Sequence, residues 1–299
     1  MHHPEPAARR LAVPAPVLVL AGMFSVQSGA AVARGLIHQV GAVTAVAIRL
    51  DIAAVVMLAI LRPAVRGRTR RAWLSVGRLA LSICLMNGFY YAAIGRLPLG
   101  IATTVEFLGP LTLAVVASRR PRDVVAVLVA LAGVLAVSGV IGTDVARLDT
   151  LGMAFALVAG VGWAGYILAS RDAGRQFLQL DGLAFALAAA GVVMTPLALV
   201  IGPAGGVGPE QLAAGAVVAV MSSVIPYSLQ MVALRSVEPR VFGILLSLEP
   251  GVAALVGFVL LGQALVPLEL VGIGLVVAAS AMVLAAQRVE PAVVLAEAV

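Results

Sequence analysis

The chain has 299 residues, of which 62% are hydrophobic and 11% are charged, and its mean hydropathy is +1.10. About a quarter of the residues of an ordinary soluble domain are charged, so this composition excludes that class and indicates an integral membrane protein. The net charge of +6 comes from arginines in short gaps between apolar runs, which favours membrane orientation over nucleic-acid binding. The single cysteine, Cys84, excludes an internal disulfide framework.

Apolar runs of membrane-spanning length follow one another along the whole chain. They predict ten transmembrane helices at about 14–33, 41–61, 73–92, 99–117, 124–142, 151–170, 183–201, 211–233, 241–261 and 267–286. The gaps between them are too short to hold a separate soluble domain. The predicted fold class is therefore an all-α membrane protein.

The arginines between these runs alternate strongly from one side of the membrane to the other. Fifteen of them lie in gaps on one side, whereas Arg34, Arg96 and Arg147 are the three on the other side. Because positively charged loops stay in the cytoplasm, both termini are predicted to be cytoplasmic. The even number of spans agrees with that orientation.

The fourth run, LGIATTVEFLGPLTLAVVA, contains one carboxylate, Glu106, and the ninth run contains Glu249 at an offset of 143 residues. Each glutamate follows a Gly-Ile pair at the same spacing, although chance similarity between apolar runs is an alternative. The offset gives two repeats of five helices, residues 1–142 and 143–299, and an odd number of helices inverts the second copy. Inverted repeats are typical of secondary transporters, whose substrate site lies near the membrane midplane.

Four charged side chains lie deep in the predicted helices: Arg49, Asp51, Glu106 and Glu249. An ion at mid-bilayer costs about 2.5–3.5 kcal/mol, so such groups face a cavity, pair with another charge or bind a proton. Arg49 and Asp51 are two residues apart and point to different helix faces, so each needs its own partner. We expect Arg49 to approach a glutamate or a substrate carboxylate, with a structural ion pair as the alternative.

Other polar and aromatic side chains at similar depth complete a candidate cavity: Gln27, Asn87, Tyr90, Tyr91, Trp163, Tyr166, Tyr227 and Gln230. The alternative is that the aromatic residues anchor the membrane interfaces. Pro110, Pro226 and Pro250 are expected to free backbone carbonyls inside the helices, at a site or only for packing. Gly160, Gly162 and Gly165 match a dinucleotide-binding pattern, but their apolar context favours close helix packing. No metal or cofactor motif is present in the sequence.

Three segments carry a resemblance to a known family: Ser25 to Leu50, Glu106 to Asp123 and Ser222 to Leu265. They resemble the threonine/homoserine exporter branch of the EamA-type proteins, within the drug/metabolite transporter superfamily. The resemblance implies ten helices in two inverted five-helix repeats, a central cavity and proton-driven export of small amino acids. Gln230 and Gln263 stand where similar proteins commonly carry glutamate, which leaves the substrate and the coupling open.

Together with this resemblance, the sequence predicts a secondary exporter of small neutral amino acids or related metabolites in the cell (inner) membrane, working by alternating access. In this hypothesis Glu106 and Glu249 exchange protons and orient the substrate amine, and either Arg49 or helix dipoles meet the substrate carboxylate. A different small metabolite or drug, a passive channel and a membrane-embedded enzyme are the alternatives. No cofactor is expected, the partners are the substrate, protons and lipid, and a monomer and a homodimer are equally compatible.

Overall fold

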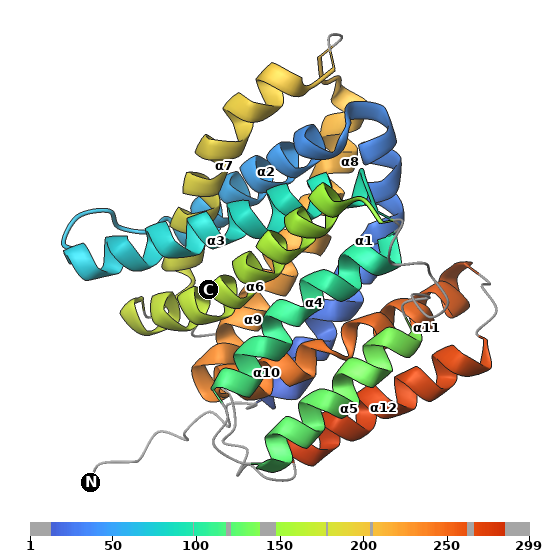
Figure 1. Cartoon of the computed structure of the whole chain (residues 1–299). Coiled ribbons are helices and arrows are strands. Elements are labelled where there is room, and N and C mark those ends of the chain that lie inside the picture. The colour runs from blue at the N-terminus through green and yellow to red at the C-terminus, as the bar shows by residue number, and fades with distance from the viewer. Residues whose placement is uncertain are drawn as a thin grey trace, which may run out of the picture.

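The computed structural model describes residues 13–97, 99–117, 121–137, 148–177, 179–203, 206–261 and 266–284, and every regular element in them is helical (Figure 1). The elements are α1 (Ala15–Val40), α2 (Ala42–Leu61), α3 (Arg70–Ile94), α4 (Leu99–Val116), α5 (Pro121–Val137), α6 (Thr150–Gln176), α7 (Asp181–Ile201), α8 (Pro209–Ala219), the π-helix η2 (Val220–Val224), α9 (Ile225–Ser236), α10 (Pro239–Leu246), α11 (Glu249–Leu261) and α12 (Pro267–Leu284). The predicted all-helical class is confirmed.

Within the described residues, each predicted run overlaps a helix or consecutive helices, and α1 continues to Val40, beyond the predicted end at residue 33. The eighth run is one rod built from α8, η2 and α9, and the ninth run is divided between α10 and α11. Within the described residues, six segments are long and apolar enough to cross a membrane: Ala42–Leu61, Arg70–Ile94, Thr150–Gln176, Asp181–Ile201, Pro209–Ser236 and Pro239–Val256. At about 1.5 Å per residue, the 27 residues of α6 are about 40 Å long, which is more than the hydrocarbon thickness.

Local sequence signals fix where several helices begin. Thr69 Oγ1 accepts a hydrogen bond from the backbone N–H of Ala72 at 3.2 Å, which caps α3. Asp149 Oδ1 accepts one from the N–H of Gly152 at 2.6 Å and caps α6 in the same way. A single residue, Gly41, joins α1 to α2 with a φ of +79°, a conformation that glycine adopts without strain.

Polar contacts identify which helix termini share an end of the bundle. At one end, which we call the Asp181 end, Arg68 Nη2 lies 2.5 Å from Asp181 Oδ2 and Arg240 Nη1 lies 2.6 Å from Asp123 Oδ2. These pairs bring together the starts of α3 and α7 and the starts of α10 and α5.

At the opposite end, which we call the Asp149 end, Arg96 Nη1 lies 3.2 Å from Asp149 Oδ2. Gln211 Nε2 donates to Gln39 Oε1 at 3.0 Å and joins the start of α8 to the end of α1. The two ends differ in charge, because the Asp181 end holds most of the arginines that flank the described helices.

The two predicted repeats interlock, because the most extensive helix contacts join one helix from each of them. These contacts are made by α3 with α6, α2 with α7, α4 with α6, α1 with α9 and α5 with α12. Figure 1 shows α5 and α12 side by side along one flank of the bundle. Large apolar side chains such as Leu199 and Val200 remain more than 80% exposed, as expected for a surface that faces lipid.

Candidate functional site

A cavity of about 500 Å³ lies among α1, α2, α3, α4, α6, η2, α9 and α11. Eleven of the twelve charged, polar and aromatic side chains predicted from the sequence line it: Gln27, Arg49, Asn87, Tyr90, Tyr91, Glu106, Trp163, Tyr166, Tyr227, Gln230 and Glu249. They come from both predicted repeats. The cavity therefore lies at the junction of the two halves.

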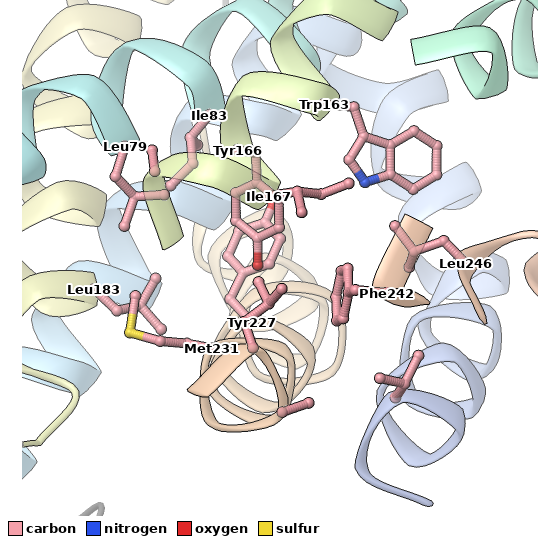
Figure 2. Packing of buried hydrophobic residues seen from close by; sticks show 14 of the residues in the cluster. Leu79, Ile83, Trp163, Tyr166, Ile167, Leu183, Tyr227, Met231, Phe242 and Leu246 are labelled. Atoms are coloured by element: carbon pink, nitrogen blue, oxygen red, sulfur yellow. The ribbon is translucent and has the colours of Figure 1, made fainter. Parts of the chain in front are cut away.

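The cavity reaches toward the Asp149 end and is closed toward the Asp181 end. Its walls include Ile37 near the end of α1, Ile94 at the end of α3 and Thr103 near the start of α4. On the opposite side, fully enclosed apolar side chains such as Leu183 and Phe242 fill the space between the helices. Figure 2 shows Leu183 and Phe242 on either side of the packed rings of Tyr166 and Tyr227, two residues that line the cavity.

One wall of the cavity is cationic and rich in hydrogen-bond donors. Arg49 is 8% exposed, its Nη2 donates to Asn87 Oδ1, and within the described residues its Nε has no partner. Asn87 Nδ2 in turn donates to the backbone oxygen of Ile83 at 2.8 Å and to the Tyr227 hydroxyl at 3.3 Å. No ion pair with an acid is formed by Arg49 in the part of the chain that the structure describes. A buried guanidinium without an anion is a strong anion site.

The acidic wall carries two carboxylates. Glu106 is 6% exposed, and Glu249 Oε1 accepts a long 3.5 Å hydrogen bond from Gln27 Nε2. Neither glutamate forms an ion pair with a basic residue among the described residues. The cavity therefore holds an unpaired cation on one wall and two unpaired acids on another.

Pro110 and a glycine contact shape the backbone next to Glu106. Pro110 lies inside α4, so the carbonyl of Glu106 lacks its usual N–H donor four residues later in the helix. A Cβ atom on Gly160 would lie 2.7 Å from that carbonyl oxygen, and one on Gly109 would lie 2.0 Å from the oxygen of Gly160. The backbones of α4 and α6 are thus in direct contact. With Gly162 equally close to α3, the close-packing interpretation of the glycine pattern is confirmed.

The second glutamate lies at a break in the helix. α10 ends at Leu246, Ser247 and Leu248 form a turn, and α11 begins at Glu249. Ser247 Oγ donates to the backbone oxygen of Ile244 at 2.6 Å, and the Ser247 N–H donates to the same oxygen at 3.0 Å. A proline at position 250 cannot bond to the carbonyl four residues earlier, which explains the break; its side chain lies outside the described residues, as does Gln263. The Glu249 carboxylate sits at the positive end of α11.

Pro226 marks a second irregular segment, which the sequence analysis did not recognise as a π-helix. Pro226 follows η2, whose carbonyl at Met221 accepts a hydrogen bond from Ser25 Oγ at 2.7 Å. Ser222, the residue whose carbonyl Pro226 cannot bond, lines the cavity. The sequence signal for Ser222 was this spacing of four residues before a proline.

Asp51 is the predicted site residue that does not line this cavity. Thr195 Oγ1 on α7 donates to Asp51 Oδ2 at 2.6 Å. A Cβ atom on Gly191 would lie 2.2 Å from Asp51 Oδ1, so this glycine makes room for the carboxylate. Since Asp51 is two residues from Arg49, the helix turns it away from the cavity and toward α7. Nowhere among the described residues do three or more His, Cys, Asp or Glu side chains lie together as metal ligands.

Comparison with known proteins gives consistent matches. Residues 150–285 match the EamA-like transporter family. The threonine/homoserine exporter RhtA of Escherichia coli K12 is 38% identical over 267 residues, which cover 88% of this chain and 89% of that protein. RhtA of Salmonella typhimurium LT2 is 36% identical over 275 residues, 92% of each chain. A crystal structure with 19% identity has a TM-score of 0.72 over 91% of this chain and 99% of its own, so it shares the fold.

Proposed function

The chain belongs to the EamA-like transporter family, and from that premise we propose that it exports small neutral amino acids of the threonine and homoserine kind. Its relatives are named as exporters, so it is a transporter and not an enzyme. Its family and its apolar helices place it in the inner membrane, as predicted. The substrate class is the part proposed here.

The observation that supports this substrate most directly is the division of charge within the cavity. A zwitterionic amino acid carries a carboxylate, which suits the guanidinium of Arg49, and an ammonium group, which suits Glu106 and Glu249. Buried charges are costly when they are unpaired, so a ligand that pairs both kinds at once is favoured over a singly charged one. If the side chain of the substrate is neutral, it brings no further charge into the cavity.

Transport proceeds by alternating access between the two repeats. In the conformation described, the cavity reaches toward the Asp149 end, and the Asp181 end is closed by packed side chains and two ion pairs. Both ion pairs join one repeat to the other, because Arg68 and Asp123 belong to the first and Asp181 and Arg240 to the second. The arginine distribution supports a cytoplasmic location for the Asp181 end. Opening that end requires both pairs to separate.

Proton coupling is assigned to Glu106 and Glu249. Each carboxylate lines the cavity and has no basic partner within the described residues, so a proton or a substrate ammonium group can neutralise it. Because a proton and a substrate ammonium group compete for the same carboxylates, the inward movement of protons is coupled to the outward movement of the substrate. The release of the substrate to the outside is then linked to proton entry.

Flux measurements on purified protein in liposomes test this function. With an imposed pH gradient, we expect threonine movement against its own gradient, abolished by Arg49→Gln and unchanged by Arg78→Gln on the exposed surface of α3. Glu106→Gln and Glu249→Gln should remove the effect of the pH gradient. Protein that moves no neutral amino acid from a broad panel contradicts the function, and flux that ignores the pH gradient contradicts proton coupling alone.

A further inference from the structure

Gln230 is a cavity side chain whose amide oxygen accepts a hydrogen bond and whose amide nitrogen donates to no described residue. It is 7% exposed and lines the cavity from α9. Its Oε1 accepts a hydrogen bond from the Tyr166 hydroxyl at 3.0 Å, and no described residue accepts one from its Nε2. A neutral amide donor is therefore available at the cavity wall.

The orientation of this amide is held by its surroundings. Tyr166 is 1% exposed, and its ring packs on that of Tyr227 with centroids 5.3 Å apart. Tyr227 and Gln230 are three residues apart on α9 and share one face of that helix. Figure 2 shows the two tyrosine rings against each other at the centre of the packed cluster. A donor fixed in this way distinguishes ligands better than a mobile one.

A series of contacts connects this donor to the anion site. Asn87 links Arg49 to the Tyr227 hydroxyl, so the anion site and the Gln230 amide flank the same tyrosine. Because Gln230 is uncharged, it suits a neutral oxygen rather than a second carboxylate. The aromatic pair of Phe107 and Trp163, with centroids 4.7 Å apart, supplies an apolar boundary elsewhere in the cavity.

We propose that Gln230 is a specificity residue whose Nε2 donates a hydrogen bond to the side-chain hydroxyl of the substrate, with Tyr166 as its positioning residue. The cavity then selects neutral amino acids that carry a hydroxyl over those of the same shape that lack one. An analogue without the hydroxyl leaves the buried amide unpaired, which is the basis of this kind of discrimination. This inference rests on the proposed transport of amino acids and names the feature of the side chain that is recognised.

The test compares isosteric pairs in liposome counterflow: threonine with valine, and homoserine with norvaline. The wild-type protein should prefer the hydroxylated member of each pair by about tenfold, the upper range for one neutral hydrogen bond. Gln230→Met, which keeps the length of the side chain, should bring that ratio close to one while valine flux persists, and persistence of valine flux reports intact folding. Tyr166→Phe should lower the ratio in part, whereas Gln39→Leu at the exposed Asp149 end should leave it unchanged.

The outcomes separate this inference from the function on which it rests. Wild-type protein that moves threonine and valine equally well, or a Gln230→Met variant that keeps the full preference, overturns the role of Gln230 and leaves amino-acid transport standing. Wild-type protein that moves none of the four amino acids overturns both.

Discussion

Removing one member of the Arg240–Asp123 ion pair should shift the protein toward a state that is open at the Asp181 end. The two side chains are 15% and 4% exposed, and Arg240 Nη1 lies 2.6 Å from Asp123 Oδ2. Breaking a buried pair costs about 3–5 kcal/mol. Because Arg240 keeps Glu238 as a second partner at 2.6 Å, the loss of Asp123 should destabilise the closed state by only about 2 kcal/mol. That corresponds to about a thirtyfold change in the ratio of the two states.

A buried thiol placed in the closed region measures this change. In a Cys84→Ala background, Ser170→Cys puts a thiol of similar size at a fully buried position of α6, one turn beyond Tyr166. The rate of labelling by a membrane-impermeant maleimide from the cytoplasmic side follows the population of the open state.

Asp123→Asn should raise this labelling rate by up to about thirtyfold. Arg240→Gln, which removes the other member of the pair, should raise the labelling rate as well. Equal labelling rates in the parent and the Asp123→Asn protein would refute the idea that the pair holds this end closed.

Three further predictions concern the contact between α4 and α6, the role of Asp51 and the Asp149 cap of α6. Gly109→Ala puts a methyl group 2.0 Å from a backbone oxygen of α6 and should lower stability by about 1–3 kcal/mol in thermal unfolding, while Gly35→Ala, which meets open space, should not. Asp51→Asn should keep threonine flux, because Asp51 faces α7 rather than the cavity; loss of flux contradicts that assignment. The N–H of Gly152 holds the pKa of Asp149 below its usual range. The Asp149 carboxylate therefore stabilises the folded protein fully above about pH 4, and this contribution is lost as the pH falls through the lowered pKa. The difference in unfolding free energy between the wild type and Asp149→Ala should shrink accordingly in acid.

The helices were predictable from sequence because a membrane imposes a simple rule on long apolar runs. Within the described residues, all ten predicted runs overlap helical segments, and helix starts follow prolines and capping residues such as Thr69 and Asp149. The π-helix was not predictable in the same way. Within it, the carbonyl of Met221 accepts a hydrogen bond from Ser25 of α1, 196 positions away, and such a distant partner is not visible in the local sequence.

Much of the candidate site was predictable for a related reason: a polar side chain in an apolar helix avoids lipid and turns inward. That rule predicts that both Arg49 and Asp51 turn inward, and their spacing of two residues shows only that they lie on different faces of the helix. Which face meets the cavity is decided by α7, where Gly191 makes room for the Asp51 carboxylate and Thr195 donates to it. Such a choice depends on packing between distant segments, which a single sequence does not contain.

Direct binding tests most sharply whether the cavity recognises both charged ends of an amino acid. Titration calorimetry on the purified protein should compare threonine with threoninamide, which lacks the carboxylate, and with N-acetylthreonine, which lacks the ammonium group. We predict that threonine binds and that each analogue binds at least about thirtyfold more weakly, because each leaves a buried charge of the cavity unpaired. Equal affinity for threonine and for both analogues would contradict the pairing of Arg49 with the carboxylate and of the two glutamates with the amine.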